Sequence, residues 1–187
     1  MVKKIKACVF ISGNGSNRSS LIKSSRDYSF PIKIVLIITN NKNSKGLNFA
    51  KKHKIPFNFF PYDSKKIFER NALNEIKKRK IKFLCLGGFM KILSKNFIRD
   101  FGYKIINIHP SLLPKFKGLN THKRVLKSRE KYSGCTVHYV SPALDSGKII
   151  LQKKVLISKN ETERSLRKKI LVQEHKIYPK SIISIFK

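Results

Sequence analysis

Short apolar runs alternate along this chain with longer segments of helical spacing, and this alternation constrains the fold more than any other feature. It is typical of βαβ units, in which helices connect parallel strands and cover the sheet. We therefore expect an α/β fold, a Rossmann-like, mostly parallel, twisted sheet with flanking helices. The apolar runs place the expected strands at 5–12, 32–39, 57–60, 81–87, 103–108, 134–140 and 148–157.

The segments between these runs predict the helices. They are expected at about 17–25, 43–53, 64–79 and 94–100, while the last two strands could pair as a hairpin across 141–147. A final helix should begin at Asn160, because Glu163 follows three residues later as in a capping box. Pro179 should kink or restart that helix. With 187 residues and no break in composition, we expect a single domain over 1–187.

The net charge of +32, from 42 basic and 10 acidic residues, first suggests binding to nucleic acid. However, 33 of the basic residues are Lys, and they are spread over every segment instead of forming a stripe. A compositional bias explains this pattern as well, so we expect no dedicated nucleic-acid partner. A positive surface would still attract anionic substrates.

The apolar segments do not support a membrane protein or an exported protein. The longest one, 32–39, contains Lys33 and is too short to span a bilayer. We expect a cytoplasmic protein without a membrane segment. The three cysteines, Cys8, Cys85 and Cys135, lie in separate apolar runs without CxxC spacing, so we expect reduced core residues. The histidines are dispersed, and no metal site is expected.

The first expected strand leads into the sequence SGNGSN at 12–17 and then into a helix. Backbone N–H groups and the positive end of a helix would converge there, which makes a site for a phosphate. The loop lacks the third glycine of a dinucleotide fingerprint and the Gly-Lys-Ser/Thr of a P-loop. An ordinary tight turn between a strand and a helix explains the same residues.

The stretch INIHPSLLPKFKG at 106–118 contains the most informative pattern. Asn107 and His109 are two residues apart at the end of a strand, so their side chains project to the same side of the sheet. Asp145 follows in a turn, where it could simply hold its own backbone. Because the chain has few carboxylates, we consider it a possible partner of His109. We interpret His138 as a packing residue or as support for the site.

Taken together, the motifs at 13–17, 86–93, 107–118, 134–138, 144–152 and 173–179 resemble the folate-dependent phosphoribosylglycinamide formyltransferases. The resemblance covers nearly the whole chain. It implies transfer of the formyl group of 10-formyltetrahydrofolate, as co-substrate, to the amine of glycinamide ribonucleotide in purine biosynthesis. It implies the catalytic residues Asn107, His109 and Asp145, the substrate-binding residues Gly15, Ser16, Asn17 and Glu174, and the folate-binding residues Lys65, Met90, Lys91, Ile92, Leu93 and Asn107.

The chain departs from the family pattern at three positions. Lys65 and Lys91 stand where relatives commonly have Arg, which keeps the charge but loses the planar guanidinium. Leu171 stands where a polar side chain is usual. Two alternatives remain, an enzyme like methionyl-tRNA formyltransferase and a basic RNA-binding module on an inactive scaffold. We expect a monomer or a weak homodimer.

Overall fold

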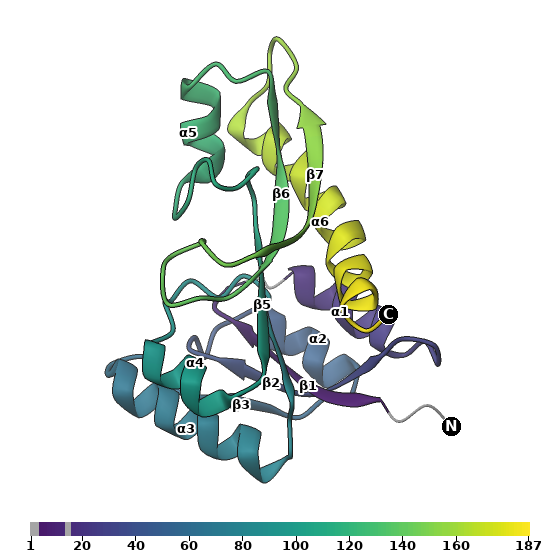
Figure 1. Cartoon of the computed structure of the whole chain (residues 1–187), viewed down its shortest axis with the longest axis vertical. Coiled ribbons are helices and arrows are strands. Elements are labelled where there is room, and N and C mark those ends of the chain that lie inside the picture. The colour runs from purple at the N-terminus through teal and green to yellow at the C-terminus, as the bar shows by residue number, and fades with distance from the viewer. Residues whose placement is uncertain (1–3, 14–15) are drawn as a thin grey trace.

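The computed structural model describes residues 4–13 and 16–187, and these residues form one twisted sheet with helices on both faces (Figure 1). The sheet has seven strands in the order β3-β2-β1-β4-β5-β6-β7. The first five are parallel, and β6 and β7 continue the sheet antiparallel. The strands are β1 (Ile5–Ile11), β2 (Ile32–Thr39), β3 (Phe57–Phe59), β4 (Phe83–Leu86), β5 (Lys104–His109), β6 (Tyr132–Tyr139) and β7 (Ile149–Leu156).

This architecture confirms the predicted mostly parallel sheet and the predicted hairpin of the last two strands. The strand predicted at 81–87 is shorter, because the Ile81 N–H still closes the preceding helix on the Ile76 carbonyl and Gly88 turns the chain with a φ of 79°. The helices are α1 (Ser16–Ser25), α2 (Gly46–Lys52), α3 (Lys65–Lys78), α4 (Lys95–Phe101), α5 (Thr121–Lys127) and α6 (Glu163–Ile185).

The predicted starts of two helices were wrong, and the last helix does not restart at Pro179. The prediction at 43–53 began too early, because the Asn41 carboxamide oxygen accepts the Asn43 N–H and forms a turn instead. The final helix begins after Thr162, not after Asn160: the Thr162 hydroxyl accepts the Ser165 N–H at 3.1 Å. Helix α6 then continues through Pro179 without restarting.

Helix α5 was not predicted. It has seven residues, and the residue at its N-cap, Asn120, has a left-handed backbone and no capping hydrogen bond from its side chain. Short helices without a side-chain cap give little signal in a sequence. This helix matters for the site, because it follows the loop that leaves β5.

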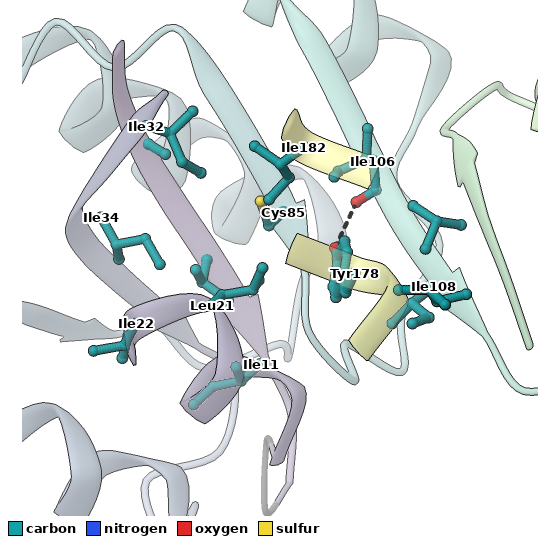
Figure 2. Packing of buried hydrophobic residues seen from close by; sticks show 14 of the residues in the cluster. Ile11, Leu21, Ile22, Ile32, Ile34, Cys85, Ile106, Ile108, Tyr178 and Ile182 are labelled. Atoms are coloured by element: carbon teal, nitrogen blue, oxygen red, sulfur yellow. Dashed lines mark hydrogen bonds between the residues drawn. The ribbon is translucent and has the colours of Figure 1, made fainter. Parts of the chain in front are cut away.

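The core lies in two layers, one on each face of the sheet. Alternate residues of β1 separate accordingly, with Val9 in the layer under α1, α2 and α6, and Phe10 in the layer under α3 and α4. Figure 2 shows the first layer, in which the Tyr178 hydroxyl of α6 donates to the Ile106 carbonyl at 3.2 Å. The same hydroxyl also lies within hydrogen-bond distance of the Leu86 carbonyl, at 2.9 Å. Tyr178 thereby links α6 to both β4 and β5.

The three cysteines are buried and free, as predicted. Cys8, Cys85 and Cys135 have no exposed surface, and burial raises the pKa of each thiol, that of Cys135 to about 12. Such thiols are poor nucleophiles, so their contribution is packing. Over the part of the chain that is described, no helix is both long and apolar enough to cross a bilayer.

Candidate active site

The carboxyl end of β5 brings together two of the predicted side chains. Asn107 and His109 lie on the same face of β5 as the buried Ile105, whereas Ile106 and Ile108 pack on the opposite face. Strand β6 pairs antiparallel with β5 and sets His138 directly opposite Asn107. The seam between the parallel and antiparallel halves of the sheet therefore gathers polar groups at one place.

Asp145 reaches this place from the turn between β6 and β7. One of its carboxylate oxygens, Oδ2, lies 3.2 Å from His109 Nδ1, and the other, Oδ1, lies 3.5 Å from the Asn107 amide nitrogen. The side chains of His109 and Asp145 are each only 7% exposed. An amide and an imidazole from β5 thus share one cluster with a carboxylate from the turn after β6.

The backbone holds the Asp145 carboxylate in this position. The Gly118 N–H donates to Oδ2 at 2.9 Å, and Asp145 itself has a left-handed φ of 45°. Burial by itself would raise the pKa of Asp145. Hydrogen bonds from His138 and from Gly118, together with attraction to both imidazoles, outweigh burial and hold that pKa below its ordinary value. Asp145 is therefore ionised at neutral pH.

His109 is bounded by an acceptor at each ring nitrogen. Its Nδ1 faces Asp145, and its Nε2 lies 2.9 Å from the Phe116 carbonyl oxygen. Burial holds the pKa of His109 below its ordinary value, although Asp145 and the Phe116 carbonyl act in the opposite direction and offset part of this effect. Two acceptors can both be satisfied only by the doubly protonated ring, so this environment offers hydrogen bonds to the charged form.

His138 supports the cluster from β6. Its Nδ1 lies 2.8 Å from the Tyr139 carbonyl, which can only accept, so this nitrogen carries a proton. The Nε2 lies 3.3 Å from the Asn107 amide nitrogen and 3.6 Å from Asp145 Oδ1. Without a proton, Nε2 accepts from the Asn107 amide and orients it; with a proton, Nε2 donates toward Asp145 Oδ1 instead. These contacts agree with the prediction that His138 is a packing residue or supports the site.

Sequence reasoning missed the backbone groups of the loop after β5. Neither the Phe116 carbonyl nor the Gly118 N–H is visible in a sequence. The Thr136 hydroxyl of β6 holds this loop, since it donates to the Ser111 carbonyl at 2.6 Å and accepts the Leu113 N–H at 3.1 Å. The register in which His109 faces Thr136 would have been the signal, but it depends on strand pairing that the sequence does not specify.

A second polar pair lies between the two helices α1 and α6. The Asn17 amide donates to the Glu174 carboxylate at 2.8 Å, although 157 positions separate them. Both side chains are buried, and burial raises the pKa of Glu174. The amide oxygen of Asn17 is buried without a hydrogen-bond partner among the described residues. Of the other predicted phosphate-binding residues, Gly15 lies outside the described residues, and only the backbone of Ser16 is described, as the first residue of α1.

The predicted folate-binding residues lie mainly in the loop between β4 and α4. The side chains of Met90 and Ile92 are exposed there, whereas Leu93 is buried in the core. The Lys91 ammonium lies 4.9 Å from the centre of the Tyr62 ring, and the Tyr62 hydroxyl donates to the Ile92 carbonyl at 3.5 Å. Lys65 is exposed at the start of α3, close in sequence to Tyr62.

The loop between β4 and α4 is anchored at its far end by a buried carboxylate. Glu69 of α3 accepts the Ser94 N–H at 2.7 Å and the Ser94 hydroxyl at 2.6 Å. Ser94 is the N-cap of α4, so Glu69 holds the point at which the loop becomes a helix. The pair of Glu69 and Ser94 was not predicted, because it depends on the packing of α3 against α4.

The sequence matches a family of known proteins over most of its length. The formyl transferase family model matches residues 5–182. The chain belongs to the formyl transferase family. The phosphoribosylglycinamide formyltransferase of Bacillus subtilis is 33% identical to this family member over 180 residues, which cover 95% of this chain and 92% of that protein.

Solved structures of formyl transferases agree with this assignment. The phosphoribosylglycinamide formyltransferase of Anaplasma phagocytophilum superimposes with a TM-score of 0.91 at 39% identity, covering 96% of this chain and 85% of that one. That of Brucella melitensis gives 0.92 at 36% identity, covering 98% and 96%. The trifunctional purine biosynthetic protein adenosine-3 of Bos taurus is 40% identical over 96% of this chain, which spans only 18% of that longer protein.

Proposed function

We propose that this formyl transferase moves the formyl group of 10-formyltetrahydrofolate to the amine of glycinamide ribonucleotide, a step of purine biosynthesis. The convergence of Asn107, His109 and Asp145 in one buried cluster carries the proposal. The names of the relatives that match nearly full length support the same acceptor. The assignment to residues is our own.

The reaction needs groups that stabilise a negative oxygen and release a proton. Attack of the amine on the formyl carbon produces a tetrahedral intermediate with an oxyanion. We propose that the Asn107 amide and the His109 Nε2–H donate hydrogen bonds to this oxyanion. For this, the Nε2–H leaves the Phe116 carbonyl and turns to the substrate oxygen. One such donor typically lowers the activation barrier by about 2.7–4 kcal/mol.

Asp145 has two tasks in this scheme. Its negative charge, 3.2 Å from His109 Nδ1, favours the imidazolium and so opposes the effect of burial on the pKa of His109. The oxyanion adds a second negative charge during the reaction and raises that pKa further. As the oxyanion collapses, the bond between the formyl carbon and the folate nitrogen breaks, and His109 acts as the general acid that protonates this departing nitrogen of tetrahydrofolate. Asp145 accepts the proton that leaves the attacking amine, directly or through a water.

The two substrates are assigned to the two sides of this cluster. We place the nucleotide next to Asn17 and Glu174, where the amide oxygen of Asn17, which has no partner among the described residues, offers an acceptor. We place the folate against the loop containing Met90, Lys91 and Ile92. Exposed apolar side chains beside the Lys91 ammonium suit a flat heterocycle that bears carboxylates.

A formyl-transfer assay tests the proposal. Purified protein is given 10-formyltetrahydrofolate with glycinamide ribonucleotide, and in parallel with initiator methionyl-tRNA. We expect transfer to glycinamide ribonucleotide. In His109→Gln, kcat should fall by about 10²- to 10⁴-fold with little change in KM. His53→Gln, at the C-cap of α2 and outside the cluster, is the matched control and should keep full activity.

The assay also separates the alternatives. Preference for the tRNA would replace the proposed acceptor. No transfer to either acceptor, together with tight RNA binding that weakens steeply with salt, would indicate a binding module. We also propose a monomer or weak homodimer in the cytoplasm. We propose no dedicated nucleic-acid partner, because the lysines are spread along the chain.

A further inference from the structure

The loops that leave β1 and β4 start side by side at the point where the strand order reverses. The sheet runs outward from β1 toward β3 on one side and from β4 toward β7 on the other. In open α/β sheets, a crevice forms outside the strand ends at such a point. Here the Ser12 N–H donates to the Gly88 carbonyl at 3.2 Å, so the two loops are bonded to each other where they begin.

The side chain of Ser12 makes a second bridge between the same loops. Its hydroxyl accepts the Met90 N–H at 2.8 Å and donates to the Asn40 carboxamide oxygen at 2.7 Å. A hydroxyl has one hydrogen, and the bond to Asn40 uses it, which leaves its lone pairs for Met90. Asn40 follows β2, so Ser12 joins the loops of three neighbouring strands.

The backbone on either side of this hydroxyl is also held in place. The Asn41 amide donates to the Ser12 carbonyl at 3.2 Å, and the Ser44 hydroxyl donates to the Gly13 carbonyl. Ser12 is therefore fixed from the side of β2, while its contact with Met90 reaches an exposed loop whose Met90 side chain is 61% exposed. A displacement of either loop changes the geometry of this hydrogen bond.

We propose that Ser12 is a positioning residue that couples the binding of the two substrates. This inference rests on the proposed function, which assigns the nucleotide to the side of α1 and the folate to the loop of Met90. A ligand that orders one loop pre-organises the other through the Ser12 hydroxyl, so the second ligand binds more tightly. Because coupling between binding sites is reciprocal, the effect is the same whichever ligand binds first.

Calorimetry with tetrahydrofolate and glycinamide ribonucleotide measures this coupling directly. The pair cannot react, because tetrahydrofolate carries no formyl group. In the wild-type protein, we expect saturating glycinamide ribonucleotide to lower the Kd of tetrahydrofolate by about 3- to 10-fold, the range of one hydrogen bond. In Ser12→Ala, the ratio of the two Kd values should fall to below about 2.

Two further variants separate coupling from general damage. Ser12→Thr keeps the hydroxyl and should retain the wild-type ratio. Ser184→Ala removes a hydroxyl that donates to the Ser181 carbonyl at the end of α6, and it should also leave the ratio unchanged. If Ser12→Ala does not fold, Asn40→Ala tests the same bridge, because it removes the acceptor that orients the Ser12 hydroxyl, and its ratio should fall part of the way.

The outcomes distinguish the two proposals. A wild-type protein that binds both ligands with a ratio of 1, or a folded Ser12→Ala with the wild-type ratio, would overturn the coupling role and leave the proposed function standing. A wild-type protein that binds neither ligand would instead overturn the proposed function, and the coupling role with it.

Discussion

Replacing Asp145 with Asn tests the chemistry of the cluster with the smallest change of shape. The amide keeps the size of the carboxylate but has one oxygen and one NH₂ group. With its oxygen toward the Gly118 N–H and His109, the NH₂ faces the amide nitrogen of Asn107, which then loses its acceptor. The reverse orientation sets the NH₂ against the Gly118 N–H. Neither orientation satisfies every donor, and both remove the charge beside His109.

The size of the effect follows from the distance between the two groups. Opposite unit charges 3.2 Å apart attract by about 1.3 kcal/mol in water and by about 5 kcal/mol at an effective dielectric constant of about 20. Loss of that attraction reduces the ratio of charged to neutral His109 by roughly tenfold to several thousandfold. If the imidazolium is the general acid, we expect kcat at neutral pH to fall by about 10- to 1,000-fold.

The assay is kcat against pH for the wild type and Asp145→Asn, with both substrates saturating. The pKa of His109 should be lower in the variant, so the alkaline limb of its profile should move to lower pH. Because the pKa of Asp145 lies below its ordinary 3.8, the carboxylate also stabilises the fold above that pH, and Tm must be checked. Normal turnover with an unmoved limb in a folded variant would refute the role of Asp145.

Three other substitutions have definite expected outcomes. Glu174→Gln should raise Tm at pH 7 and weaken nucleotide binding. Burial raises the pKa of Glu174, so the ionised carboxylate destabilises the fold at pH values above its unfolded pKa of 4.5. Thermal melts should therefore show no gain in Tm near pH 4. Tyr178→Phe removes the hydrogen bonds to Leu86 and Ile106 and should cost about 1 kcal/mol in urea denaturation. Phe10→Ala, in a cluster of phenylalanine rings, should cost about 3–5 kcal/mol in the same measurement.

Much of the fold could be predicted because the strands inside the sheet are largely buried on both faces. Ile32–Thr39 is almost entirely apolar, and its observed limits are those predicted. Elements whose limits depend on single hydrogen bonds were predicted less well. The start of α6 depends on whether Asn160 or Thr162 provides the cap, and both residue types suit that position. The sequence alone does not decide between them.

The cluster itself was predictable only in part. Asn107 and His109 share one strand, so their common direction follows from the period of two. The approach of Asp145 is different, because it depends on the hairpin of β6 and β7 folding back beside β5. Similarly, the pair of Asn17 and Glu174 requires α1 to pack against α6. Contacts of this kind are properties of the tertiary fold, and local patterns contain little information about them.

The change of strand direction after β5 explains why the cluster lies where it does. The parallel strands direct their carboxyl ends, and therefore the loops assigned to both substrates, to one edge of the sheet. Because β6 runs antiparallel to β5, His138 lies opposite Asn107. The turn after β6 leaves the sheet beside Ile105 and folds back, so that the Asp145 carboxylate reaches His109 at 3.2 Å. The antiparallel pair thus brings a charge partner to His109 without displacing the loops of the parallel half. A variant that shortened the turn between β6 and β7 should therefore abolish turnover while leaving the parallel half folded.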